Sequence, residues 1–353
     1  MIHQRVTLKH IAARAGVHVT TVSMALRNSP RLAAATRTRL QELAAEMGYQ
    51  PDPMLSSLMV YRKNTIQPHY QGTLAWINTD PVAPQQFVSD LRKGAEERCQ
   101  ELGYQLETLY LSKMGPDRLA KICLARNIQG LMFPPLMARY EDMILPWDRF
   151  STVGLGLTLS RMRHHVVANA QYHSARLGLR ALNQHGYRRI GFVSSPDSDE
   201  RTDHNFSSGY QVERDLLLKK GEQSAVLPIL NLTDEYPSQK LQFKAWYEEH
   251  RPDAILTLLL HCSRLMGDLG ISYEECGLAL LALTDPNGEV AGVCQNDHVI
   301  GRSAVDFLVG MIQRNERGMP SAPLQILVES SWLEGATVPR PALRPLEMFP
   351  IVA

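Results

Sequence analysis

Short hydroxyl side chains gather on one face of a helix predicted near the start of the chain. In residues 19–27, Val22, Ala25 and Leu26 have the spacing of an inward apolar face. The opposite face carries short polar, apolar and basic side chains, namely Val19, Thr20, Ser23, Met24 and Arg27. The valine, threonine and serine side chains are short enough for the helix backbone to lie deep in a DNA major groove, where hydroxyls reach phosphates and base edges. These residues therefore predict hydrogen bonding to duplex DNA.

Two further helices must position that face. Residues 8–15 have apolar side chains at helical spacing, with Thr7 as the expected N-cap and Gly16 as the residue that ends the helix. A third helix is predicted over residues 34–47 and is followed by Gly48. Two short helices joined at a small residue are typical of a helix-turn-helix, although an ordinary three-helix bundle has the same pattern.

Charge is distributed unevenly along the chain. Residues 1–70 contain nine Lys and Arg against three Asp and Glu, a net charge of +6. Because the whole chain has a net charge of +1, the other residues carry −5. A basic head on an acidic body indicates a polyanionic partner, and a solubilising charge fluctuation is the alternative.

Length and composition exclude several classes of protein. With 353 residues, 44% of them hydrophobic and 21% charged, the chain is long enough for two or three domains with sizeable cores. No apolar run approaches the roughly 18 residues of a membrane helix, and the first residues do not resemble a secretory signal. The five cysteines are scattered and form no CxxC pair. We therefore expect a cytoplasmic protein with no membrane partner.

Strands and helices alternate from residue 71 onward. Strands are predicted at residues 72–77, 105–110, 130–133, 152–155, 189–193 and 254–259. Helices are predicted at residues 87–102, 117–126, 174–185 and 208–220. This alternation predicts parallel sheets with crossover helices, and about 270 residues are best divided into two such α/β lobes.

The residue pattern of the first 51 residues is more specific than their hydrophobic periodicity. Thr7-Leu8-x-x-Ile11-Ala12-x-x-Ala15-Gly16-Val17-x-x-x-Thr21-Val22-Ser23-x-Ala25-Leu26 resembles the DNA-binding domain of the lac-repressor (LacI/GalR) family. The resemblance continues through Thr36-Arg37 and residues 48–51. In the body it is carried by residues 186–193, 251–255 and 297–308, so that it covers residues 5 to about 338.

The resemblance implies a fold and a function. The fold is an all-α helix-turn-helix head (1–50), a hinge helix and linker (51–70) and a two-lobed body (71–338) like the periplasmic binding proteins, doubly wound α/β. Lobe 1 would hold residues 71–166 and 295–324, and lobe 2 residues 167–294 and 325–338. The function is a repressor that binds a pseudo-palindromic operator as a homodimer, with a sugar-like effector controlling its affinity. The proline-rich tail (339–353) has no heptad repeat, so a coiled-coil tetramer is not expected.

DNA-contacting residues follow from the same resemblance. Positions matching Val19, Thr20 and Met24 read bases in the family, those matching Thr21 and Ser23 hold phosphates, and the one matching Leu58 wedges into the minor groove. The full expected set is Thr7, Val19, Thr20, Thr21, Ser23, Met24, Arg27, Asn28, Thr36, Arg37 and Leu58. Two residues depart from the family. Met24 cannot make a bidentate contact to guanine, and His18 replaces a serine, which predicts that the second helix lacks its usual N-cap.

The expected effector site departs further from the family. Phe206 occupies the position of a sugar-gripping arginine, Leu259-Leu260 replace an Asn-Asp pair, and the next acidic position falls at Thr284 or Asp285. Near the C-terminus Glu334 replaces another arginine, and Gln295 completes the expected effector contacts. Because a buried sugar hydroxyl without a partner costs about 1–3 kcal/mol, we expect a less polar effector or a cleft that has lost its response.

Enzyme and cofactor chemistry find no support in the sequence. Phosphate-binding loops and a GxSxG elbow are absent, and the sequence at residues 154–156 lacks a third glycine. The pairs His164-His165 and His261-Cys262 do not have metal-ligand spacing, and the acidic residues at 197–203 are typical of a solvated loop. We therefore expect no enzyme, no cofactor and no metal. The rival hypotheses are an architectural DNA binder with a vestigial cleft and a cytoplasmic solute-binding protein.

Overall fold

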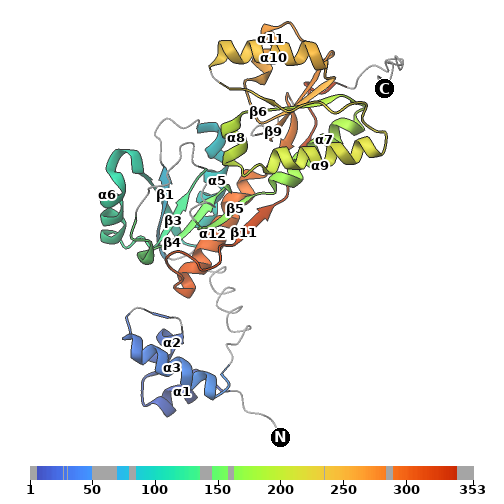
Figure 1. Cartoon of the computed structure of the whole chain (residues 1–353). Coiled ribbons are helices and arrows are strands. Elements are labelled where there is room, and N and C mark those ends of the chain that lie inside the picture. Colours follow the sequence, from blue (N-terminus) through green and yellow to red (C-terminus); the bar gives the residue numbers. More distant parts are fainter. Residues whose placement is uncertain are drawn as a thin grey trace.

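The computed structural model describes residues 6–26, 28–29, 31–49, 70–78, 85–135, 145–157, 163–233, 235–283 and 289–339, with side chains from residue 89 in the fifth range. These residues form a small helical head and two α/β lobes (Figure 1). No helix in these ranges is long and apolar enough to cross a bilayer.

Three helices build the head: α1 (Leu8–Ala15), α2 (Val19–Leu26) and α3 (Ala34–Glu46). Their inward faces meet in a core formed by Ile11, Ala12, Val22 and Ala44. Gly16 ends α1 in the left-handed conformation (φ 67°), which glycine adopts without steric cost. The chain can therefore turn sharply between α1 and α2, as the sequence predicts.

Lobe 1 is built on a parallel sheet with the strand order β11-β5-β4-β3-β1-β2. Its strands are β1 (Gly72–Asn78), β2 (Tyr104–Tyr110), β3 (Gly130–Phe133), β4 (Ser151–Leu155), β5 (His165–Asn169) and β11 (Gln325–Val328). Its helices are α5 (Gln85–Glu101), α6 (Leu111–Ala125), the short 3-10 helix η1 (Trp147–Arg149) and α12 (Asp297–Arg314). Separate apolar clusters contain the α6 side and the α5–α12 side of this sheet.

Lobe 2 is built on a second six-stranded sheet with the order β12-β10-β9-β8-β6-β7, in which only β12 is antiparallel to its neighbour. Its strands are β6 (Ile190–Ser194), β7 (Leu230–Asn231), β8 (Ala254–Thr257), β9 (Gly277–Leu283), β10 (Ala291–Cys294) and β12 (Ser331–Leu333). Its helices are α7 (Gln171–Gln184), α8 (Pro196–Arg201), α9 (Asn205–Lys219), α10 (Tyr236–His250) and α11 (Cys262–Asp268).

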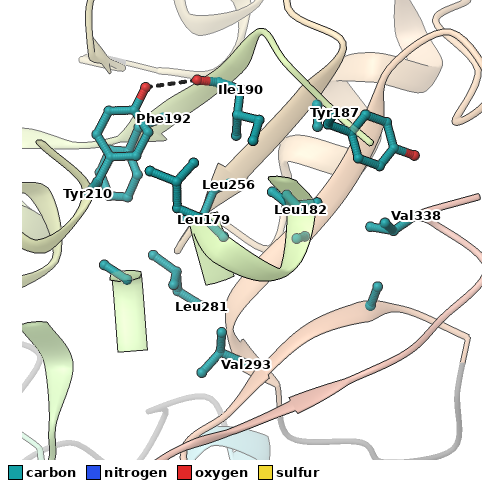
Figure 2. Packing of buried hydrophobic residues seen from close by; sticks show 14 of the residues in the cluster. Leu179, Leu182, Tyr187, Ile190, Phe192, Tyr210, Leu256, Leu281, Val293 and Val338 are labelled. Carbon is teal, nitrogen blue, oxygen red and sulfur yellow. Dashed lines mark hydrogen bonds between the residues drawn. The ribbon is translucent and has the colours of Figure 1, made fainter. Parts of the chain in front are cut away.

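Buried aromatic side chains hold α9 against this second sheet. The rings of Phe192 and Tyr210 lie 5.0 Å apart between centroids, and the Tyr210 hydroxyl donates to the Ile190 carbonyl at 2.8 Å (Figure 2). Because the phenol has a partner inside the core, its burial leaves no unsatisfied donor. Desolvation in this core raises the pKa of Tyr210.

The chain crosses between the lobes three times. It leaves lobe 1 after β5, returns after β10, and leaves again after β11. The first and third crossings therefore come at about 170 and 329–330, a few residues later than the boundaries of 166 and 324 expected from the sequence. Both differences arise because β5 and β11 pair with each other and extend the sheet of lobe 1, and such pairing depends on partners distant in sequence.

Helix α6 begins earlier than predicted. It starts at Leu111 instead of residue 117, and Gly115 interrupts it in a left-handed conformation (φ 71°) just before Pro116. Two short helical pieces are thus joined at a glycine that can take this backbone angle. Proline at the start of the second piece is tolerated because a first-turn N–H has no helical partner.

Candidate nucleic-acid interface and effector cleft

The second helix of the head presents a mixed polar face. Val22 and Ala25 are buried, Thr20 is exposed, and Met24 is partly exposed. Thr21 and Ser23 are also partly exposed, whereas Val19 packs in part against the core of the head. The surface of α2 that is open to a partner is therefore centred on Thr20, with Met24 one turn further along the helix.

His18 takes the place of the usual N-cap residue at the start of α2. The backbone N–H of Thr20 points to His18 Nδ1 at 3.4 Å, and Thr20 Oγ1 lies 2.9 Å from the same nitrogen. Nδ1 is two bonds from Cβ, as is Oδ1 of the common N-cap asparagine, so the ring can place an acceptor over the helix start. The residue type alone does not indicate this role, because histidine is not among the usual N-cap residues.

The turn between α2 and α3 is held by amide side chains. Gln41 Nε2 donates to Asn28 Oδ1 at 2.7 Å and to the Ala25 carbonyl at 2.9 Å. Asn28 has a positive φ of 53°, and its carbonyl accepts from Asn315 Nδ2 at 3.0 Å. Gln41 was not among the expected site residues. The oxygen of the Asn28 side chain is engaged within the head, which leaves its amide nitrogen as the group that could meet DNA.

Basic side chains on the head are open to a polyanion. Lys9, Arg14, Arg31 and Arg39 are exposed, and none of the ion pairs among the described residues involves a head side chain. Arg39 reaches the Ala15 carbonyl at 3.2 Å and so links α3 to the end of α1. The positive charge inferred from composition therefore lies at the surface of the folded head.

Several expected contacts remain predictions. Thr7 is exposed beside the start of α1, while Thr36 and Arg37 are partly buried at the start of α3, where Arg37 donates to the Ser29 carbonyl at 3.4 Å. Arg27, the hinge with Leu58, and the acidic position at Thr284 or Asp285 lie outside the described residues.

The interlobe side of the body contains the expected effector residues only in part. Each crossing follows the carboxyl end of a strand, so these ends face the junction of the lobes, where α/β sheets commonly bind ligands. Leu260 follows β8 on this side and is 49% exposed, whereas Leu259 packs partly into the lobe 2 core. Gln295 follows β10, and its Nε2 donates to the Leu281 carbonyl at 2.7 Å.

Phe206 does not lie open to a ligand, which corrects the position expected for it. Its side chain is 1% exposed and belongs to the main apolar cluster of lobe 2. A phenyl ring at this position gains more from the core than from a wet cleft. Glu334 is likewise engaged elsewhere, because its carboxylate contacts His185 Nε2 at 2.8 Å at the C-terminal end of α7.

A separate groove of about 390 Å³ lies between α7 and the segment that joins β11 to β12. It is lined by His173, Ser174, Arg176, Leu177, Arg180, Glu329 and Ser330. Arg176 and Arg180 both bind the buried carboxylate of Glu213 on α9, at 2.8 and 2.6 Å. Burial raises the pKa of Glu213, but hydrogen bonds from the two guanidiniums outweigh it, so the net pKa is lowered. This cluster joins α7 to α9.

Comparison with known proteins agrees with this architecture. Residues 7–52 match the family model described as bacterial regulatory proteins, lacI family. The regulator PtxS of Pseudomonas putida is 24% identical over 343 residues, 88% of this chain and 96% of that protein. The regulator DegA of Bacillus subtilis is 30% identical over 137 residues and the repressor PurR of Proteus mirabilis 27% over 200. These two alignments cover 36% and 54% of this chain, and the chain spans only 38% of DegA and 54% of PurR.

Solved structures support the fold of the whole chain. The regulator CelR in complex with cellobiose superposes with a TM-score of 0.57 at 20% identity, covering 93% of this chain and 98% of that one. The lac repressor dimer bound to operator and the anti-inducer ONPF gives 0.55 at 16% identity, covering 95% and 99%. The fold and the head thus define a helix-turn-helix protein with a two-lobed body like the periplasmic binding proteins. Its head matches the lacI family model of bacterial regulatory proteins over residues 7–52, and 88% of the chain aligns with the regulator PtxS.

Proposed function

We propose that this protein is a sequence-specific transcriptional repressor that binds a pseudo-palindromic operator as a homodimer. The observation that carries the proposal is the exposed polar face of α2 on a head whose basic side chains have no acidic partner among the described residues. In a helix-turn-helix the second helix enters the major groove, and a two-fold dimer places two such helices one helical turn of DNA apart. The hinge residue Leu58 would insert at the operator centre.

The two-lobed body supports control of that binding by an effector. Three separate segments join the lobes, so a ligand that closes the cleft changes their relative orientation and, through the hinge, the spacing of the two heads. A coupling free energy of about 2–3 kcal/mol changes operator occupancy by about 30- to 150-fold. Such a range is sufficient for regulation.

Selection of bound duplexes from a random pool at physiological salt tests the operator hypothesis. We expect an inverted repeat, bound more weakly by Leu58→Ala and with relaxed preference at one symmetric base step for Met24→Ala. Met319→Ala is the matched control, because this methionine is 47% exposed on the body. Binding without any enriched sequence, with a steep salt dependence, would instead identify an architectural DNA binder.

Free sugars are expected to be poor effectors of this protein. A structural neighbour is a complex with cellobiose and another contains bound ribose, but here Leu260 is open and Phe206 is withdrawn into the core. We therefore expect that millimolar cellobiose or ribose leaves the melting temperature and operator affinity unchanged, whereas a ligand at 100 times its Kd adds about 2.7 kcal/mol. CelR with cellobiose serves as the positive control. A sugar held in the cleft of this chain would contradict the prediction.

A further inference from the structure

A histidine and a threonine at the start of α2 share one hydrogen-bonding arrangement. His18 immediately precedes the helix, and its Nδ1 lies 2.9 Å from Thr20 Oγ1 and 3.4 Å from the Thr20 backbone nitrogen. Both side chains are exposed on the head. In the described hydrogen-bond network, His18 is the side chain that contacts the Thr20 hydroxyl.

The direction of these hydrogen bonds follows from the backbone contact. A backbone N–H can only donate, so Nδ1 must be the unprotonated ring nitrogen and the proton of the neutral imidazole is on Nε2. Nδ1 then has no hydrogen to give, and its single lone pair is shared by two donors. The Thr20 hydroxyl must therefore also donate its proton to Nδ1, which leaves only oxygen lone pairs facing outward.

We propose that His18 is a positioning residue for DNA specificity that turns Thr20 into a pure hydrogen-bond acceptor. A free threonine hydroxyl contacts donors or acceptors on base edges equally well. With its proton committed to His18, Thr20 selects an amino group, N6 of adenine or N4 of cytosine, and disfavours guanine and thymine at the step that it reads. This inference rests on the proposed function, in which α2 lies in the major groove.

The chain offers a matched control for the capping role of histidine. His10 Nδ1 accepts from the Thr7 backbone N–H at 3.3 Å at the start of α1, so α1 also has a histidine acceptor at its first turn. Replacing His10 by alanine removes that acceptor without touching Thr20. A loss of head stability alone can then be separated from a change in base preference.

Binding is measured on the full-length protein, using the selected operator with all four bases at each step. The Thr20 step is the one at which Thr20→Val relaxes the preference. We expect the wild type to favour adenine or cytosine there by about threefold to tenfold. His18→Ala should abolish this preference, His18→Asn should restore it because Oδ1 can accept the same proton, and His10→Ala should leave it unchanged.

A double-mutant cycle separates orientation of the hydroxyl from general damage. In the Thr20→Val background, His18→Ala should cause no further change in base preference, although it still weakens the cap. The proposal is overturned if Thr20→Val relaxes no step or if His18→Ala leaves the wild-type preference intact. If the wild type enriches an operator and either of these results is found, only the role of His18 is refuted. If the wild type enriches no sequence, the proposed function and this inference are refuted together.

Discussion

Gly301→Ala is expected to destabilise lobe 1 by about 3 kcal/mol, although it adds a single methyl group. A Cβ at this position would lie 2.0 Å from the Leu91 carbonyl oxygen and 2.9 Å from the Ala95 nitrogen, both on α5. The partner helix has the reciprocal feature, since a Cβ on Gly94 would lie 2.1 Å from the His298 carbonyl oxygen. The two helices therefore touch through their backbones, and a methyl group can be accommodated only if they move apart.

Urea unfolding of Gly301→Ala and Gly267→Ala tests this prediction. Gly267 lies within α11, and a Cβ there would meet no atom within 4 Å. Its replacement should be neutral or stabilise the protein by up to about 1 kcal/mol, because alanine loses less backbone entropy on folding. The two substitutions are chemically identical, but only Gly301→Ala is expected to destabilise the protein. Equal effects would show that the α5–α12 contact does not limit stability.

A second large effect is expected from the buried imidazole of His164. The side chain is 1% exposed, its ring lies 4.5 Å from that of Trp147, and neither ring nitrogen has a hydrogen-bond partner in the described ranges. Burial, with a smaller contribution from His165, lowers the pKa of His164 to about 4. Because the unfolded state binds this proton below about pH 6.5, His164 costs stability as the pH falls from there towards 4, by up to about 3 kcal/mol.

Asp297 acts in the opposite direction over the same pH range. Burial at the start of α12, with a smaller contribution from Asp90, raises the pKa of Asp297 to about 7. The folded state therefore keeps this proton where the unfolded state has lost it. The resulting stabilisation is full below about pH 4 and is lost as the pH rises to 7, again on the order of 3 kcal/mol.

Variants at these two positions should reveal two pH dependences that largely cancel in the wild type. Relative to the wild type, His164→Phe is expected to gain about 3 kcal/mol between pH 7 and 4.5, and Asp297→Asn to lose about as much. Unfolding free energies measured at several pH values provide the test. Other titrating groups are common to all three proteins and drop out of the differences. Parallel curves for wild type and His164→Phe would show that this imidazole is not held neutral by burial.

The sequence-based predictions were accurate for features that neighbouring residues determine. The helices of the head begin and end close to the predicted residues because apolar spacing and Gly16 determine them within one or two turns of chain. The strand–helix alternation predicted two α/β lobes for the same reason. The resemblance of residues 7–26 to the family also indicated α2 as the helix whose exposed face carries Thr20 and Met24. The roles of these two residues in DNA binding stay predictions.

Other features depend on contacts that the residue types alone do not indicate. His18 was judged by residue type, and its role as a cap became visible only when its ring nitrogen was seen over the start of α2. The lobe boundaries shifted because β5 and β11 pair across more than 150 residues of sequence. Phe206 was expected to contact a ligand but lies in the core of lobe 2. An apolar side chain on α9 is compatible with either environment, and the packing of lobe 2 determines which one it occupies.

Local sequence patterns were sufficient to predict the class of this protein: a basic three-helix head, with one helix predicted to contact DNA, joined to two α/β lobes. Hydrophobic periodicity, turn residues and charge are local properties, so they can be identified without knowing the tertiary contacts. Three-dimensional packing determines which distant strands pair, as β5 and β11 do, and which titrating groups are desolvated, as at His164 and Asp297. Strand pairing and desolvation depend on atoms that folding brings together from other parts of the chain, and a local sequence pattern does not predict them.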